Sequence, residues 1–170
     1  MSSISFSEPE ESKACQGVDA VSGASALRRD GQVKGSNQYV AELPARDAGA
    51  DLFRLETVEQ YPREHEALTK FAKGEAERNA RPELKALPDL PAYDTVFIGY
   101  PVWWYGMPMA LHAMFDKLDF SGKRIAPFTV HGGSHLGGTD DEIRRLEPSA
   151  KVLKGLAISR SDVADEDIPQ

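Results

Sequence analysis

The sequence predicts an α/β protein in which helices pack on a parallel β-sheet. Residues 95–99 (TVFIG) and 124–130 (RIAPFTV) are short apolar runs near turn-forming residues, a pattern typical of strands that are buried on both faces. Between them, apolar residues recur at helical spacing from Met107 to Leu118. In open sheets of this class, ligands bind at the carboxyl ends of the strands, so the loops after the two runs are the first candidates for a functional site.

The composition favours one domain over residues 1–170, which is long enough for a sizeable core. A net charge of −7 argues against nucleic acid as a partner and suits a protein that meets a basic partner surface. No apolar run approaches the roughly 18 residues that cross a membrane, and the first residues lack a signal-peptide pattern. We therefore expect a cytoplasmic protein. The single cysteine, Cys15, provides neither an intramolecular disulfide nor a multi-thiolate metal site.

The chain begins with a short predicted strand and a long loop. Ile4 and Phe6 alternate with serines, enough for a strand that ends near Ser7. Residues 8–34 lack a sustained periodic pattern of apolar residues. We interpret them as a mostly irregular insertion in the first strand–helix loop, and loops of this length are often functional. Within it, DAVSGAS (19–25) resembles the motif at which flavin transferases attach FMN to Thr or Ser, which would make Ser25 the acceptor. The simpler interpretation is a Gly/Ser loop near a ligand.

A helix is predicted directly after Gly35. Its first turn offers unpaired backbone N–H groups and the positive end of the helix dipole, which suit an anion. Ser36 and Asn37 add side-chain donors there, although each is equally a good N-cap. We expect Pro44 to shorten or kink this helix and residues 51–56 (DLFRLE) to form the next strand.

Aromatic residues gather at the end of the apolar run that follows, after a solvated helix expected within residues 61–81. Both tryptophans of the protein lie in this one loop. A flat, partly exposed aromatic shelf at a strand end suits a planar ring system, and the alternative is that the tryptophans only cap the core. The loop contains, in order, Tyr100, Pro101, Val102, Trp103, Trp104, Tyr105 and Gly106.

A glycine-rich loop follows the second apolar run. Residues 131–139 (HGGSHLGGT) contain four glycines, which let the backbone approach a ligand closely. Thr139 and Glu142 have capping-box spacing for the next helix, and residues 151–158 (KVLKGLAI) form the last predicted strand. An anion cradle, an aromatic shelf and a glycine-rich wall would thus meet at one edge of the sheet, as a phosphorylated planar cofactor requires.

Several of these motifs together resemble flavodoxin-like proteins of the bacterial group whose aromatic loop contains YPxWW followed by MPMA. Residues 100–104 (YPVWW) and 107–110 (MPMA) match that signature. The resemblance runs from residue 49 to residue 158. It also includes ARPEL (80–84), FSGK (120–123), PFTVHGGS (127–134) and GLAIS (155–159).

This resemblance implies a flavodoxin-like three-layer sandwich, with a five-stranded parallel sheet in order 2-1-3-4-5 and FMN at the switch point. Relative to the family pattern, we expect a shortened first strand and an incomplete last helix. The sequence GSN at 35–37 stands where the family often has GNT. The cofactor-binding residues implied are Ser7, Gly35, Ser36 and Asn37 around the phosphate; Tyr100, Pro101, Val102, Trp103, Trp104 and Gly106 on one side of the isoalloxazine; and His131, Gly132, Gly133, Ser134 and Gly137 on the other.

The expected function is that of an FMN-binding flavodoxin-like electron-transfer protein, whose partner is a redox protein or a small-molecule electron acceptor. The enzymatic alternative is an NAD(P)H-dependent FMN quinone or azo reductase, in which His131 or His135 would protonate or orient the substrate. A third interpretation is a trimmed flavodoxin-like module without redox activity. We expect no metal site, because the four histidines lack a metal-ligand spacing.

Overall fold

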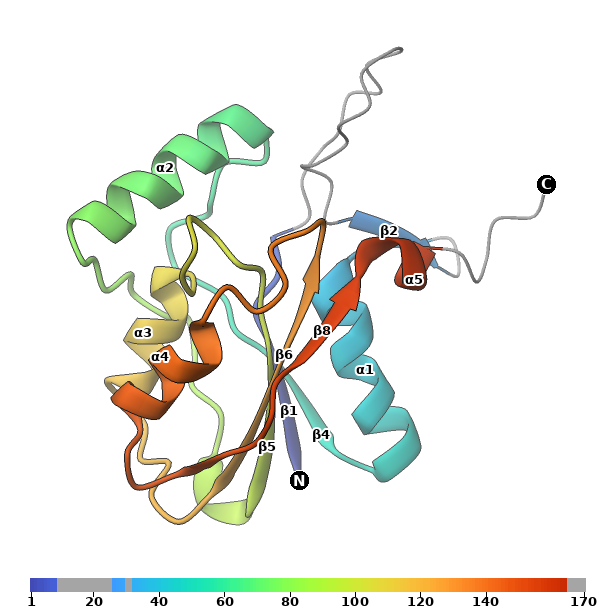
Figure 1. Ribbon diagram of the computed structural model, residues 1–170, viewed down its shortest axis with the longest axis vertical. Helices are drawn as coiled ribbons and strands as arrows, with labels where there is room; N and C mark the ends of the chain where they lie inside the picture. Colours follow the sequence, from blue (N-terminus) through green and yellow to red (C-terminus); the bar gives the residue numbers. More distant parts are fainter. Residues whose placement is uncertain (9–25, 30–31, 165–170) are drawn as a thin grey trace.

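The computed structural model describes residues 1–8, 26–29 and 32–164, and a parallel sheet forms its middle layer (Figure 1). Helices α1 and α5 cover one face of the sheet, and α2, α3 and α4 cover the other. Within these residues, no helix is long and apolar enough to span a membrane. The strands of the sheet are β1 (Ser2–Ser5), β4 (Asp51–Arg54), β5 (Thr95–Gly99), β6 (Arg124–His131), β7 (Lys151–Val152) and β8 (Leu156–Ser159). The helices are α1 (Ser36–Ala48), α2 (His65–Glu77), α3 (Met109–Phe115), α4 (Thr139–Leu146) and α5 (Arg160–Ala164), with a 3-10 turn η1 (Leu90–Ala92).

The strand order confirms the expected flavodoxin-like arrangement. Strands β4, β1, β5 and β6 are neighbours in that order, and all their pairings are parallel. Strands β7 and β8 both pair with β6, one after the other, and so share the last position of the sheet. The order is therefore 2-1-3-4-5. Strand β1 is short but central, since each of its residues pairs with both β4 and β5.

Alternation along β1 assigns its side chains to two different layers. Ile4 and Phe6 are fully buried in the core that forms under α2, α3 and α4. On the opposite face, Oγ of Ser3 donates a hydrogen bond of 2.7 Å to a backbone carbonyl of α1. Because alternate residues share a face, Ser5 and Ser7 are directed toward the same helix. The small serine side chains let α1 pack closely against the central strand.

A second, smaller core lies on the α1 side of the sheet. Val40 and Ala41 of α1 pack there with Phe128 and Val130 of β6 and with Val163 of α5. Helix α5 is thereby docked beside the first half of α1, at the carboxyl ends of the strands.

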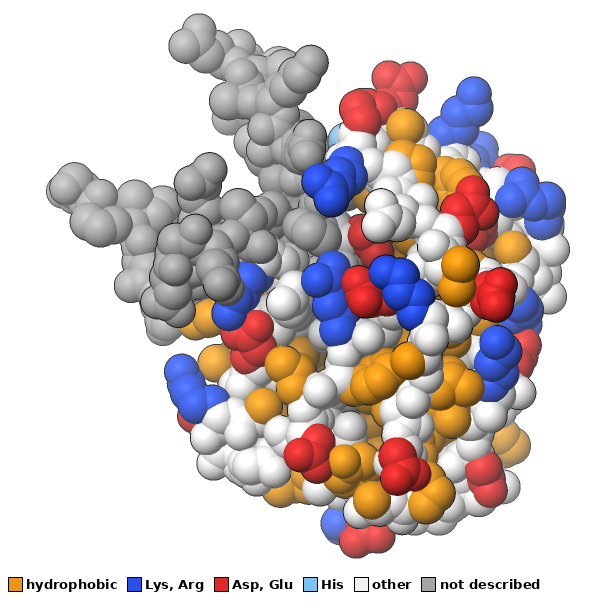
Figure 2. Space-filling view, turned by 180° about the vertical axis from the view of Figure 1, so that it is seen from behind, with side chains coloured by type: hydrophobic (Ala, Val, Ile, Leu, Met, Phe, Trp, Pro, Cys, Tyr) orange, Lys and Arg blue, Asp and Glu red, His pale blue; other side chains and the backbone are white. Residues whose placement is uncertain are grey.

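The surface opposite to the view of Figure 1 mixes acidic, basic and hydrophobic side chains (Figure 2). Charged groups of both signs are scattered over this face, and hydrophobic groups gather over its middle and lower part. The net charge of −7 is therefore not concentrated in one acidic patch on this face. The large hydrophobic side chains that are exposed anywhere in the described residues are Met1, Leu52, Val58, Leu87, Trp104, Tyr105 and Leu156.

The prediction of an irregular insertion at residues 8–34 is wrong for its last part. An antiparallel pair, β2 (Ala26–Arg29) and β3 (Gln32–Gly35), leads directly into α1. The intervening dipeptide, Asp30–Gly31, is of the kind that two-residue hairpin loops favour, and this local signal outweighs the lack of a longer period. Residues 19–25, with the candidate acceptor Ser25, lie outside the described residues.

The two predictions about helix ends have different outcomes. Pro44 lies inside helix α1, which continues to Ala48, and the last turn is closed by the N–H of Gly49, which donates to the carbonyl of Pro44 and has a left-handed φ of 63°. The helix therefore continues past Pro44, and a kink at this residue stays a prediction. Helix α4 has no capping box, since its N-cap is Gly138 (φ 82°) and no side chain caps it. Thr139 and Glu142 are engaged instead in contacts with the aromatic loop.

The predicted last strand at residues 151–158 is split into β7 and β8. Between the two pieces, residues 153–155 lie opposite only residues 126–127 of β6, which amounts to one extra residue, as in a β-bulge. Pro127 lies at this point of β6 and has no N–H to donate to a neighbour. The missing donor gives a physical reason for the break in pairing.

Candidate functional site

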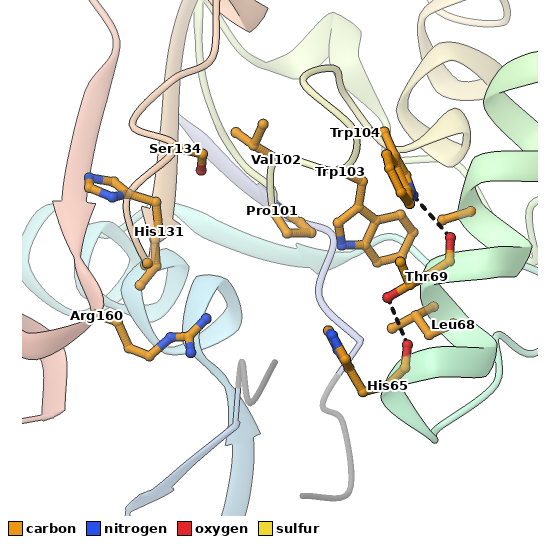
Figure 3. Close-up of a pocket in the computed structure, with 13 residues that line it drawn as sticks. His65, Leu68, Thr69, Pro101, Val102, Trp103, Trp104, His131, Ser134 and Arg160 are labelled. Atoms are coloured by element: carbon orange, nitrogen blue, oxygen red, sulfur yellow. Dashed lines mark hydrogen bonds between the residues drawn. The ribbon is translucent and has the colours of Figure 1, made fainter. Parts of the chain in front are cut away.

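A pocket of about 320 Å³ opens at the carboxyl ends of β5, β6 and β8 (Figure 3). Its walls are the loop after β5, the loop after β6 and the first half of α2. The indole of Trp103 stands in the middle of the pocket wall, and His65 and Arg160 lie on opposite sides of the lower opening. The lining residues are His65, Leu68, Thr69, Ala72, Pro101, Val102, Trp103, Trp104, Val130, His131, Gly132, Ser134 and Arg160.

An aromatic cluster behind the pocket holds Trp103. Its ring centroid lies 5.5 Å from that of Phe6 and 5.4 Å from that of Tyr61, and both contacts are edge-on. The hydroxyl of Tyr61 also donates a hydrogen bond of 2.7 Å to Oε2 of Glu75 in α2. Burial and this hydrogen bond raise the pKa of Tyr61, and burial raises the pKa of Glu75. Edge-on packing fixes the Trp103 indole while leaving it in the pocket wall.

Trp104 forms the outer rim of the pocket and ties the aromatic loop to α2. Its indole Nε1 donates a hydrogen bond of 3.0 Å to the backbone carbonyl of Thr69. The ammonium group of Lys73 lies 5.1 Å from the centre of the Trp104 ring, within the range of a cation–π contact. The neighbouring Tyr105 is 86% exposed. The two tryptophans therefore have different positions, Trp103 in the wall and Trp104 at the rim.

The tip of the aromatic loop is a tight turn made of unusual residues. Trp103 and Gly106 exchange two backbone hydrogen bonds, each of 3.0 Å. The residues between them, Trp104 (φ 50°) and Tyr105 (φ 63°), are both in the left-handed region. Two-residue turns of this type normally contain Asn and Gly, and bulky residues in this conformation cost roughly 1–3 kcal/mol each. Backbone strain of this kind clusters at functional sites, and here it places the side chain of Trp104 at the pocket rim.

The first turn of α4 holds both ends of the aromatic loop. The hydroxyl of Tyr100, at the start, donates to Oγ1 of Thr139 (3.0 Å). The backbone N–H of Met107, at the end, donates to Oε2 of Glu142 (3.2 Å). The other oxygen, Oε1, lies 3.0 Å from Nε2 of His112. Burial opposes ionisation of Glu142, but the contacts with His112 and Met107 outweigh it and hold the pKa of Glu142 below its usual value.

The glycine-rich loop after β6 forms the opposite wall. Nδ1 of His131 accepts a hydrogen bond of 3.0 Å from the N–H of Gly133, which requires this nitrogen to be unprotonated. Burial, followed by the nearby ring of His135 at 4.5 Å, lowers the pKa of His131, so the imidazole is neutral at pH 7. Gly137 has a φ of 59°, and a Cβ at this position would lie 3.0 Å from Cγ1 of Val102. Glycine at this position lets the two loops meet.

Buried donors without partners lie beside the first turn of α1. Ser7 Oγ and Asn37 Nδ2 have no hydrogen-bond partner among the described residues, and neither does Ser5 Oγ on the same face of β1. The side-chain oxygen of Asn37 accepts from the N–H of Val130 (2.8 Å), which leaves the amide nitrogen for another partner. A Cβ at Gly35 would lie 1.8 Å from Ser7 Oγ, so glycine is needed there. Unsatisfied buried donors cost about 1–3 kcal/mol each, and together with a helix N-terminus they suit an anion.

The structure gathers most of the predicted site residues in these two places. Tyr100 differs from the others, because its fully buried side chain lies in the core and does not line the pocket. Gly106 lies beside Glu142, and Gly133 and Gly137 shape the loop without lining the pocket. Pro101, Val102, Trp103, Trp104, His131, Gly132 and Ser134 line the pocket, and Ser7, Gly35, Ser36 and Asn37 lie at the start of α1.

Two contributors to the pocket were not expected from the sequence. One is the first half of α2, which supplies His65, Leu68 and Thr69 and has only a weak helical period in the sequence. The other is Arg160, which directly follows β8. The rule that ligands bind at the carboxyl ends of strands applies to this residue as well and is the signal that would have found it.

Fold and site together define a doubly wound α/β protein with a ligand site where the strand order reverses. A family model described as Flavodoxin matches residues 31–168. The chain therefore belongs to the flavodoxin family, which confirms the resemblance of its motifs. A comparison with curated proteins found no match.

Solved structures with the same fold share little sequence with this chain. A protein described as a flavoprotein from Bacteroides uniformis ATCC 8492 is 22% identical with a TM-score of 0.66, over 92% of this chain and 88% of that one. A second, from Bacteroides eggerthii DSM 20697, is 21% identical with a TM-score of 0.68, over 94% and 88%. A flavoprotein from Lactobacillus acidophilus NCFM, solved in complex with FMN, is 16% identical with a TM-score of 0.66, over 94% and 93%. At these identities the likeness concerns the fold.

Proposed function

We propose that this chain binds FMN and works as an electron-transfer protein. The proposal depends on one observation: two unsatisfied buried donors, Ser7 Oγ and Asn37 Nδ2, lie next to an aromatic pocket. The two are directly connected, because the backbone of Val130 in the pocket wall donates to Asn37. A phosphate would satisfy the donors, and a flat ring would fill the pocket beside Trp103. The residues present therefore fit a phosphorylated planar cofactor.

Family membership and one structural relative support FMN as that cofactor. The Lactobacillus acidophilus flavoprotein, which shares the fold, was solved in complex with FMN. In this chain, Ser7, Ser36 and Asn37 would hold the phosphate. Trp103 on one side and residues 131–134 on the other would hold the ring.

The residues of the chain would set the surroundings of the flavin, which itself supplies the redox chemistry when bound. Trp103 and Leu68 exclude water from the pocket wall and lower its polarity. His131 is held neutral by its low pKa and by the N–H of Gly133, so it adds no charge beside the ring. Trp104 and Tyr105 form an exposed aromatic rim, through which a redox protein or a small electron acceptor would approach.

The second candidate function is an NAD(P)H-dependent FMN reductase of quinones or azo compounds. It is favoured by two imidazoles, His65 and His131, that line the pocket mouth. A substrate lying on the flavin ring would meet a hydrogen-bond or proton donor there. Because Nδ1 of His131 accepts from Gly133, its donor in the neutral form is Nε2–H.

Titration of the purified chain with FMN tests the proposal. We expect a yellow protein with one FMN per chain and quenched tryptophan emission, since Trp103 lies in the pocket wall. Asn37→Ala should weaken FMN binding by about tenfold or more, because it removes a buried donor. The matched control is Gln38→Ala, one position further along α1 and less buried. A folded chain that stays colourless with excess FMN would overturn the proposal.

A second measurement separates the two candidate functions. The FMN-loaded chain is mixed with NADPH and a quinone, with and without a separate NADPH–flavin reductase. Steady NADPH oxidation by the chain alone supports the reductase. Electron flow that requires the added reductase supports the carrier.

A further inference from the structure

Arg160 extends into the pocket from the end of the last strand. It is the first residue of α5, directly after β8, and Figure 3 shows its guanidinium at the lower opening, opposite His65. Its Nη2 lies 3.7 Å from the position that a Cβ would take on Gly132. The guanidinium thus packs over the backbone of the glycine-rich loop, which has no side chain at this position. Arg160 is therefore part of the pocket lining and is partly exposed at its opening.

Three contacts connect the neighbours of Arg160 to the first half of α1. Ser159, the residue before it, pairs with His131. Val130, adjacent to His131, donates to the side chain of Asn37. Three residues after Arg160, Val163 packs against α1 in the smaller core. The start of α5 is therefore tied both to the pocket wall and to the helix whose first turn carries the unsatisfied donors.

The lining of the pocket itself carries positive charge, while the carboxylate of Asp162, two residues after Arg160, lies close enough to act on His131. Among the residues that the structure describes, no acidic side chain lines the pocket, and Arg160 is the one permanently charged residue of its lining. The chain as a whole carries a net charge of −7, which opposes the approach of an anion. The donors at the start of α1 are neutral hydroxyl, amide and backbone groups. A guanidinium beside them supplies the positive charge that they lack, and its fork of donors matches phosphate oxygens.

We propose that Arg160 binds the phosphate of the cofactor, so that this chain distinguishes FMN from riboflavin by charge as well as by neutral hydrogen bonds. This inference rests on the proposed function. It assigns a role to the residue after β8, in addition to the donors after β1 and at the start of α1. A cation in this role also makes cofactor binding sensitive to salt, because mobile ions screen the attraction.

The test compares two flavins that differ only in the phosphate. Dissociation constants for FMN and riboflavin are measured by fluorescence titration of the wild-type chain, Arg160→Gln and Arg160→Lys. The matched control is Arg124→Gln, at the opposite end of β6 from the pocket. Circular dichroism and urea unfolding establish that each variant is folded.

We expect Arg160→Gln to weaken FMN binding by about tenfold, as for the loss of a hydrogen bond to a charged group, and to change riboflavin binding by less than about twofold. Arg160→Lys should keep part of the preference, and its FMN affinity should fall as salt is raised. Arg124→Gln should bind both flavins as the wild type does.

Two other outcomes count against the inference in different ways. If Arg160→Gln weakens both flavins equally or neither, Arg160 does not bind the phosphate, while the proposed function stands. If the folded wild-type chain binds neither flavin, both the inference and the proposed function are wrong.

Discussion

Glu142 connects helix α4 to the end of the aromatic loop, and its neutralisation should loosen that loop in a pH-dependent way. The substitution Glu142→Gln keeps the shape of the side chain but removes its charge. In the structure, its two oxygens contact the backbone N–H of Met107 at 3.2 Å and Nε2 of His112 at 3.0 Å. The Glu142 and His112 side chains are only 23% and 11% exposed, so solvent screens the pair weakly.

The magnitude follows from the two hydrogen bonds. Hydrogen bonds to a charged group contribute about 1.5–3 kcal/mol, against about 1 kcal/mol for neutral ones. Glu142→Gln should therefore lower the free energy of unfolding by about 1 kcal/mol at pH 7. Glu142→Ala, which leaves Met107 N–H without its acceptor, should lower it by about 2–3 kcal/mol. In the FMN-loaded chain, both should also weaken cofactor binding, because the loop carries Trp103.

The dependence on pH identifies the charge as the cause. Contacts with His112 and Met107 outweigh burial and hold the pKa of Glu142 below its unfolded value, which is near 4.3. Its contribution to stability is therefore present above about pH 4.3 and is lost as the pH falls through the lower folded pKa. Urea unfolding should show a larger difference between wild type and Glu142→Gln at pH 7 than at about pH 3.

The control is Asp141→Asn, on the same helix. The Asp141 side chain is 70% exposed and pairs with Arg144, so its loss should change stability by less than about 0.5 kcal/mol. The reasoning is refuted if Glu142→Gln is as stable as the wild type at pH 7. It is also refuted if the difference persists unchanged at pH 3, since the charge would then not be responsible.

Three further predictions concern the buried pair behind Trp103, the phosphate cradle and the histidine in the pocket wall. Burial raises the pKa of Glu75, so the contribution of this residue to stability is lost as the pH rises through its folded pKa. The variant Glu75→Gln still accepts the hydrogen bond from Tyr61 but carries no charge. In urea unfolding it should be more stable than the wild type at pH 8 but not at pH 4. At Gly35 the backbone (φ −69°) would permit alanine, but there is no room for a Cβ. Gly35→Ala should therefore weaken FMN binding by about tenfold or more, whereas the control Gly74→Ala in α2 should leave binding unchanged. The pKa of His131 is lowered, and an NMR titration should place its midpoint below 6.5; a midpoint at or above that value contradicts the hydrogen bond from Gly133.

The strands could be predicted because each carries its own local pattern. Ile4 in β1 and Phe6 directly after it alternate with serines, and β5 and β6 have the apolar runs of strands covered on both faces. The order of the strands came from the family resemblance, since local patterns do not encode which strands are neighbours. The break between β7 and β8 arises where Pro127 of β6 has no N–H to donate. Because the cause lies in β6, the sequence of residues 151–158 does not reveal the break.

The site was predictable where it depends on strand ends and not where it depends on packing between distant segments. Trp103 and His131 follow strands whose carboxyl ends meet at one edge of the sheet. Tyr100 also follows a strand, but it continues the alternation of Ile98 and so faces the core. The contact of Trp104 with Thr69 joins residues 35 positions apart, and neither segment has a local pattern that reveals it.

The central position of β1 has a consequence for how the chain folds. Ser2 pairs with Asp51 on one side and with Val96 on the other, so both neighbours of β1 are synthesised after it. At ribosomal rates of about 5–20 residues per second, β5 follows β1 by roughly 5–20 s. During that interval the apolar face of β1 lacks part of the structure that will cover it. The adjacent β5–α3–β6 segment has the shorter loops to close. We therefore expect it to form first, with β1 inserted afterwards between β4 and β5 in the step that completes the sheet.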